Sequence, residues 1–166
     1  TCALPIYTSS APESITRLLD MGMDPFNFSD AILGILAQRL VRTLCKNCKK
    51  TYHATREEHQ HLIERYGKHE FETDFPDLMT YRDNIVLHNP AGCTNCGQTG
   101  YAGRMGIHEP LVATEDSKRM IQMQARLEEL KDQAIKDGMR TLEQDGIKKI
   151  FDGFTDIKQV RKVCAA

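Results

Sequence analysis

Four of the six cysteines form two pairs with identical spacing, and this pattern constrains the fold more than any other feature. In each pair, Cys45-x-x-Cys48 and Cys93-x-x-Cys96, two residues separate the cysteines, which lets both thiolates of one loop face a single ion. Two such loops complete the tetrahedral shell that Zn²⁺ prefers. Gly97 follows the second pair, where such a loop often needs a positive φ. We therefore predict that Cys45, Cys48, Cys93 and Cys96 bind one zinc ion.

Four thiolates leave no open coordination position, so the predicted zinc site is structural rather than catalytic. Iron also accepts four thiolates, and the ligands alone do not separate it from zinc. Two disulfides or a redox-active pair are weaker alternatives, because two matched pairs favour one shared ion and we expect a reducing compartment. Cys2 and Cys164 lack partners at ligand spacing, and Cys164 is predicted to make an apolar contact on the last helix.

The residues between the two pairs, 49–92, exceed what a compact zinc ribbon needs, so a folded segment must lie between them. Thr55-x-x-Glu58 is a capping box that predicts a polar helix ending near Gly67. Residues 68–83 have weak periodicity and are predicted to be irregular. We expect the strand ending at Leu44 and the strand from Arg104 to pair at the base of an insertion that carries the cysteine loops and the polar helix outward.

Apolar periodicity and capping signals predict the remaining elements. The Met120 and Met123 stripe is interpreted as core packing rather than a ligand set, and His53 and His88 are expected to be surface residues or neighbours of the metal ligands. The predicted helices are Ser10 to Gly22, Ser29–Ala37 with Ile32, Leu33 and Leu36 inside, Met120 to Gly138, Thr141 to Gly153, and a last helix capped by Thr155; the predicted strands are Gln38–Leu44, Ile85–Leu87 and Met105–Val112, the last broken by Pro110 and preceded by a turn at Gly100–Gly103.

Charge and hydropathy exclude several classes of function. The chain has 22 basic and 23 acidic residues, and this balance argues against nucleic-acid binding, which needs clustered Lys and Arg. Its apolar runs are too short to span a bilayer, and no signal peptide is visible, so we expect a cytoplasmic location. The sequence also lacks a G-x-x-x-x-G-K-[ST] phosphate loop, an H-E-x-x-H motif and a nucleophile elbow. No catalytic residue is predicted.

The first six residues, Thr1–Ile6, fit nothing that follows them. They correspond to the translated end of a common short-read sequencing adapter, so we interpret residues 1–6 as a non-native scar. The alternative is a natural strand end at Leu4-Pro5-Ile6.

Several motifs, taken in order, resemble the C-terminal portion of the type II secretion and type IV pilus assembly ATPases, and the resemblance covers residues 8–164. The matching segments are Ala11–Gly22, Gln38–Cys45, Cys93–Leu111 and Gly138–Gly146, followed by Gly153-Phe-Thr155. The resemblance implies an α/β fold: the C-terminal part of a RecA-like ATPase domain, with an inserted four-cysteine zinc module and a C-terminal helical subdomain. The implied division is 7–44 for the ATPase core, 45–99 for the zinc insertion, and 100–166 for core strands and the helical subdomain.

The resemblance also implies an ATP-driven assembly with partners in the inner membrane. Family members bind ATP and Mg²⁺, form homohexamers, and act on inner-membrane platform proteins, so the implied location is the cytoplasmic side of the inner membrane, with membrane association through partners. The phosphate loop and acidic metal-binding motifs of the family would lie before residue 1, so this chain alone is expected to be inactive. Tyr7-Thr8-Ser9 stands where the family's histidine box ends, and no catalytic role is carried over to it. Gln38-Arg39-Leu40 matches without an assigned role, and secretion and pilus paralogues share all these motifs.

A second class of function remains open at this point. The chain could be a stand-alone zinc-bearing module that binds another protein, because a closed thiolate shell is as suitable for an adaptor as for an insertion in a motor.

Overall fold

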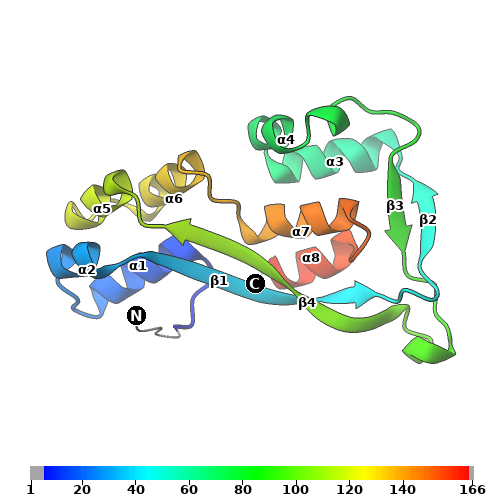
Figure 1. Cartoon of the computed structure of the whole chain (residues 1–166), viewed down its shortest axis with the longest axis horizontal. Coiled ribbons are helices and arrows are strands. Elements are labelled where there is room, and N and C mark those ends of the chain that lie inside the picture. The colour runs from blue at the N-terminus through cyan, green and yellow to red at the C-terminus, as the bar shows by residue number, and fades with distance from the viewer. Residues whose placement is uncertain (1–5, 165–166) are drawn as a thin grey trace. The chain divides into compact units, whose positions relative to one another are not determined.

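The computed structural model describes residues 6–164; Cys2 and all but Ile6 of the predicted non-native segment 1–6 lie outside these residues. The chain contains both helices and strands and ends in four consecutive helices, in agreement with a mixed α/β fold (Figure 1). The elements are α1 Ala11–Asp20, α2 Pro25–Ala31, β1 Gly34–Leu44, β2 Lys50–His53, α3 Arg56–Tyr66, α4 Lys68–Asp74, η1 Pro76–Leu78, β3 Val86–Asn89, η2 Thr94–Cys96, β4 Tyr101–Val112, α5 Glu115–Gln122, α6 Leu127–Lys136, α7 Leu142–Phe151 and α8 Ile157–Cys164.

The chain divides into two compact units that are not consecutive in sequence. The first contains residues up to Gln38 together with His108–Leu142, and the second contains Arg39–Ile107 together with the residues from Glu143 onward. β1 and β4 pair into a two-stranded sheet, and each strand contributes residues to both units. This confirms the expected pairing of the strands on either side of the cysteine segment.

In the first unit, the predicted start of α1 at Ser10 is confirmed. The Ser10 side chain accepts a hydrogen bond from the Glu13 amide at 3.3 Å, as an N-cap does. The left-handed end at Gly22 is also present, with φ 94°. A buried apolar cluster fills this unit; its fully or nearly fully buried members include Ile15, Leu111, Ile121, Leu130 and Ala134.

The predicted helix over 29–37 is wrong. α2 is earlier and shorter, Pro25–Ala31, because Asp24 caps it and Pro25 supplies its first turn. β1 begins at Gly34, where a Cβ atom would lie 2.7 Å from the Leu111 carbonyl oxygen of the paired strand. Leu33 and Leu36 are therefore 73% and 60% exposed rather than inside, while Ile32 is buried as expected.

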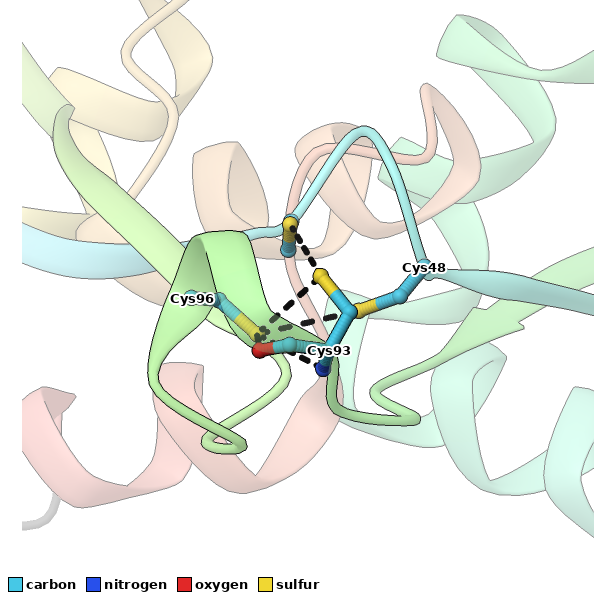
Figure 2. Close-up of side chains that lie close together, drawn as sticks. Cys48, Cys93 and Cys96 are labelled. Atoms are coloured by element: carbon cyan, nitrogen blue, oxygen red, sulfur yellow. Dashed lines mark hydrogen bonds between the residues drawn. The ribbon is translucent and has the colours of Figure 1, made fainter.

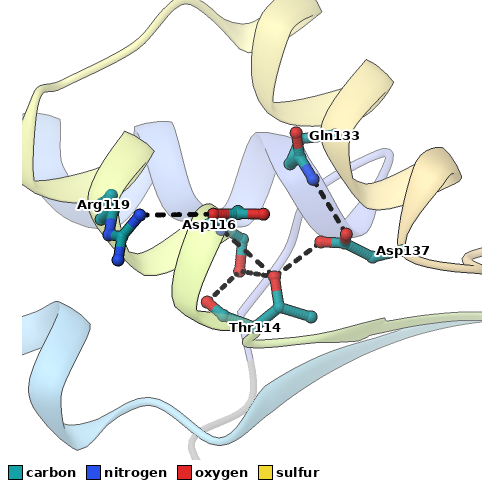
Figure 3. Close-up of polar contacts among 6 residues, drawn as sticks. Thr114, Asp116, Arg119, Gln133 and Asp137 are labelled. Atoms are coloured by element: carbon teal, nitrogen blue, oxygen red, sulfur yellow. Dashed lines mark hydrogen bonds and ion pairs between the residues drawn. The ribbon is translucent and has the colours of Figure 1, made fainter.

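The predicted single helix from Met120 to Gly138 is two helices, α5 and α6. Gln124 has a positive φ of 50° between them, which ends α5, and Met123 is 80% exposed instead of lying in the core. Figure 3 shows the contact between the start of α5 and the end of α6. Thr114 caps α5, and its hydroxyl also donates to the carboxylate of Asp137, which follows α6, at 2.6 Å. Met120 does pack against the core, as predicted.

β4 runs unbroken from Tyr101 to Val112, so the predicted turn at 100–103 and the break at Pro110 are both wrong. Gly100 and Gly103 have positive φ values of 79° and 83°, and these explain the turn-like glycine pattern. Pro110 is compatible with the strand because a strand in a two-stranded sheet has one side without a hydrogen-bonding partner.

In the second unit, β2 and β3 form an antiparallel pair with Lys50 opposite Asn89 and His53 opposite Val86. α3 has the predicted capping box at Thr55 and Glu58, and ends at Gly67. The segment predicted to be irregular instead contains α4, because Phe71 is completely buried against other aromatic rings. That aromatic cluster consists of Tyr66, Phe71, Phe75 and Phe151, with neighbouring ring centroids 5.1–5.8 Å apart.

The helices between the two cysteine pairs share one core with the end of the chain. Leu62 and Ile63 of α3 belong to the same buried cluster as Ile147 and Ile150 of α7 and Val160 of α8. The prediction that an insertion carries the polar helix outward is therefore wrong: this helix, α3, packs into the core. Cys164 packs against this cluster, as predicted.

Candidate metal centre

The four predicted ligands converge at one point in the second unit (Figure 2). Cys45 follows the last residue of β1, Cys48 closes the next turn, and Cys93 and Cys96 lie at the two ends of the short helix η2. The four sulfur atoms all lie within 4.8 Å of one another. The individual Sγ–Sγ distances are 3.9 Å for Cys45–Cys93, 3.8 Å for Cys48–Cys96 and 3.7 Å for Cys93–Cys96.

These distances match a tetrahedral metal site. Four sulfurs placed about 2.3 Å from a central ion at tetrahedral angles would lie about 3.8 Å from one another. A disulfide would need an S–S distance of about 2.05 Å, and no disulfide joins the cysteines among residues 6–164. The donor set and its spacing therefore fit Zn²⁺, or another ion that prefers four thiolates.

The two cysteine loops share one backbone hydrogen bond, from the amide of the second cysteine to the carbonyl of the first, and differ in the next one. In the first, the amides of Cys48 and Lys49 donate to the Cys45 carbonyl at 3.3 and 2.9 Å. In the second, the amides of Cys96 and Gln98 donate to the Cys93 carbonyl at 3.2 and 2.9 Å. The predicted positive φ at Gly97 is confirmed at 59°, which turns the chain after Cys96.

Backbone amides also point at the sulfur atoms. The Gly92 amide donates to Cys48 Sγ at 3.3 Å, and the amides of Cys93 and Gly100 each donate to Cys96 Sγ at 3.2 Å. Burial raises the pKa of the Cys48 thiol to about 11. Burial acts in the same direction at Cys96, but hydrogen bonds from the Cys93 and Gly100 amides and from the Cys93 and Cys48 side chains together outweigh it and lower its pKa to about 6. Amides directed at sulfur stabilise thiolates, the protonation state that a metal ligand requires.

The histidines near the loops differ from one another. His53 is exposed, whereas His88 is partly buried and its Nδ1 atom has no hydrogen-bond partner. Burial, and then the Lys49 charge, lower the pKa of His88. Its ring lies against Gly153, where an added Cβ atom would be 2.7 Å from His88 Cε1.

A cavity of about 160 Å³ lies between α3, β3 and the start of α8. Two of its polar side chains are bonded, because the Tyr52 hydroxyl donates to Glu58 at 3.1 Å and Asp156 accepts from Tyr101 and from the Gln159 amide. Nδ1 of His88, another lining residue, has no partner. Burial, followed by the Glu58 charge, raises the pKa of Tyr52 to about 12. No nucleophile is paired with a base among these lining residues. The four cysteines are not among the lining residues, so the cavity is separate from the candidate metal centre.

The sequence analysis missed the residues that hold the loop between α7 and α8 beside this centre. Asp156, not Thr155, caps α8, by accepting from the Gln159 amide at 3.0 Å. Thr155 is fully buried and its hydroxyl donates to the Arg42 carbonyl at 2.8 Å. The only signal in the sequence was the match of Gly153-Phe-Thr155 to the family pattern, which carries no information about contacts.

Comparison with known proteins identifies the relatives of this chain. A family model described as "Type II/IV secretion system protein" matches residues 2–162. Similar curated proteins include the type IV pilus assembly ATPase TfpB of Acinetobacter baylyi, 37% identical over 158 residues, and the type IV pilus assembly ATPase PilB of Thermus thermophilus, 37% identical over 155 residues. The type II secretion system ATPase E of Vibrio cholerae is 34% identical over 158 residues.

These alignments cover almost all of this chain but a small part of each relative. They include 95%, 93% and 95% of the chain, and 25%, 16% and 28% of the Acinetobacter, Thermus and Vibrio proteins respectively. The chain therefore spans no more than 28% of the length of these three relatives. Both pilus and secretion proteins are among them, at similar identity.

Proposed function

Because this chain belongs to the type II/IV secretion system protein family, we propose that it is part of a motor ATPase that couples ATP hydrolysis to protein secretion or pilus assembly. The observation that carries this proposal is the similarity, over 93–95% of the chain, to proteins named as ATPases of these two systems. The finer expectations follow from membership: a RecA-like domain that binds ATP and Mg²⁺, a homohexamer, and inner-membrane platform partners on the cytoplasmic side.

Within that motor, the contribution of this chain is a structural metal site. Cys45, Cys48, Cys93 and Cys96 hold Zn²⁺ and fix two loops that are far apart in the sequence. The sulfur spacing supports this role. A closed shell of four thiolates leaves no position for substrate or water, so the metal site itself takes no part in ATP hydrolysis.

The exposed apolar side of β1 supports a larger α/β domain. Leu36 and Leu40 are 60% and 51% exposed, while Ala37 and Val41, which point the other way, are buried. β1 has apolar residues on both sides although it pairs in a two-stranded sheet. Strands of this kind are typical of α/β domains, in which other elements cover both faces of the sheet. Among residues 6–164 no helix has both the length and the apolar character to cross a bilayer.

The stand-alone adaptor is the competing function, and the reading frame upstream of Tyr7 separates the two. A phosphate loop upstream supports the motor, and a start codon just before Tyr7 would defeat it. The biochemical test compares the full-length protein with this chain alone. We expect Mg²⁺-dependent ATP hydrolysis by the full-length protein and none by the 166-residue chain. Hydrolysis by the chain alone would contradict the proposal.

A further inference from the structure

Of four consecutive residues between α7 and α8, three are bonded to residues 42–49, which bear the first cysteine pair, and the fourth is bonded to Tyr101 at the start of β4. We call these bonds, made by Gly153–Asp156, the loop contact. On the loop side, two of these bonds use a backbone carbonyl, one uses a buried hydroxyl, and one uses the carboxylate that caps α8. The Gly153 carbonyl accepts from Lys49 Nζ at 2.7 Å, the Phe154 carbonyl accepts from the Leu44 amide at 2.8 Å, the Thr155 hydroxyl donates to the Arg42 carbonyl at 2.8 Å, and the Asp156 carboxylate accepts from the Tyr101 hydroxyl.

Three of the four residues in the loop contact are buried, whereas Phe154 is 45% exposed. Thr155 is 0% exposed and Asp156 is 6% exposed. Gly153 is buried with φ 76°, and the His88 ring occupies the space where a side chain would be. Because buried polar groups are costly when they lose their partners, these bonds form together or the loop rearranges.

The partners of the loop lie next to metal ligands. Leu44 immediately precedes Cys45, and Lys49 immediately follows Cys48. Their relative positions are set by the turn between the two cysteines, in which the Lys49 amide donates to the Cys45 carbonyl at 2.9 Å. Four sulfurs within 4.8 Å of one another repel when ionised, so the turn holds its shape when a cation neutralises them.

We propose that metal binding at the four cysteines controls the order of the loop contact, so that the α7–α8 loop and the start of α8 report metal occupancy. The inference rests on the proposed metal site and extends it to residues outside the ligand set. The side chains of α7 and α8 in the apolar core, such as Ile147 and Val160, do not depend on the turn. Loss of metal therefore releases the loop and the first turn of α8 without unfolding both helices.

Hydrogen exchange on the full chain, with metal content measured in the same samples, tests the proposal. The reporters are the amides of Phe154, which donates to the Lys149 carbonyl at 3.0 Å, and Val160, which donates to the Asp156 carbonyl at 3.2 Å. Chelation of zinc is expected to speed exchange about tenfold at 152–160, the scale of one lost hydrogen bond. Helices α5 and α6 should exchange at an unchanged rate.

Two variants test the loop contact without touching a ligand. Thr155→Val removes the hydroxyl donor at nearly constant volume, and Lys49→Met removes the ammonium group. The matched controls are Thr16→Val in α1 and Lys46→Met, an exposed lysine inside the same turn. We expect both test variants to keep stoichiometric zinc but to exchange faster at 152–160 even when loaded, and both controls to behave as wild type.

The outcomes separate the two proposals. If the chain contains zinc and chelation speeds exchange only at the cysteine loops, the loop contact is independent of metal and this inference is wrong while the metal site stands. The inference is also wrong if Thr155→Val and Lys49→Met leave exchange at 152–160 unchanged, or if chelation speeds exchange in α5 and α6 as much as in α8. If purified chain contains no stoichiometric metal under reducing conditions, the metal site and this inference are both overturned.

Discussion

Glu109 shows how one residue can join distant parts of the chain. Only 4% of it is exposed, yet its carboxylate accepts from the Ala11 amide at 2.7 Å and from the Leu142 amide at 3.1 Å. Both amides belong to the first residue of a helix, α1 and α7, where backbone N–H groups have no partner within the helix. The negative charge also suits the positive end of each helix dipole.

Glu109→Gln should therefore destabilise the chain although it preserves the size of the side chain. One amide would face a nitrogen that cannot accept a hydrogen bond, and the charge at two helix ends would be lost. We expect a loss of about 1–3 kcal/mol in the free energy of unfolding, measured by urea denaturation. Glu72→Gln, at an exposed position, is the matched control and should change it by less than about 0.5 kcal/mol.

At the metal centre, Cys45→Ser or Cys93→Ser should reduce bound zinc well below one ion per chain. A hydroxyl is a much poorer zinc ligand than a thiolate, and three ligands lose much of the affinity. Elemental analysis of purified variants is the measurement. Cys164→Ser removes a thiol outside the cluster and should leave the metal content unchanged; a parallel loss in that variant would show that the four cysteines are not the ligands.

At the scale of elements, the end of α7 and the loop after it depend on a glycine. Gly153 combines φ 76° with contact to the His88 ring, and the amide of Gly153 donates to the Ile150 carbonyl at 3.0 Å. Gly138 after α6 has φ 101° but no atom within 4 Å of an added Cβ. The two helix ends therefore need glycine for different reasons. Gly138 is needed for its backbone conformation, and Gly153 is needed both for its conformation and because a side chain would have no space.

Gly153→Ala and Gly138→Ala form a matched pair. Both substitutions cost the strain of a positive φ, about 1 kcal/mol, and only the first adds a clash with His88. We expect Gly153→Ala to lower the free energy of unfolding by about 1–2 kcal/mol more than Gly138→Ala. Equal effects in thermal or urea denaturation would mean that His88 moves aside at no cost.

At the scale of the whole molecule, β1 exposes large apolar side chains. Leu36 and Leu40 lie on one side of it, and Val41 lies on the other with 1% of its surface exposed. Exposed apolar residues on a sheet favour association with another surface, whether a further part of the same domain or a second copy.

Leu36→Lys with Leu40→Lys should reduce self-association of the 166-residue chain and leave its stability within about 0.5 kcal/mol, because neither side chain is in the described core. Val41→Lys, the control on the buried side, should unfold the chain. Sedimentation measures the first effect and urea denaturation the second. A double variant that unfolds like Val41→Lys would show that the exposed side of β1 is packed in solution.

The sequence by itself determined the local and covalent features of this protein. The paired cysteines, the N-cap at Ser10, the capping box at Thr55 and the positive φ at Gly97 depend on a few adjacent residues, so they could be predicted and are present. Family membership was likewise visible in the motifs at both ends of the chain.

Only the tertiary structure decided which segments pack together. An apolar pattern at 32–36 fits a helix or a strand equally well, and pairing with β4 decided for the strand. The aromatic cluster ordered α4, and the shared core joined α3 to α7 and α8. The same long-range packing brought Gly153 to Lys49 and Thr155 to Arg42, beside the first cysteine pair. Such contacts depend on residues about a hundred positions apart, and no local pattern contains them.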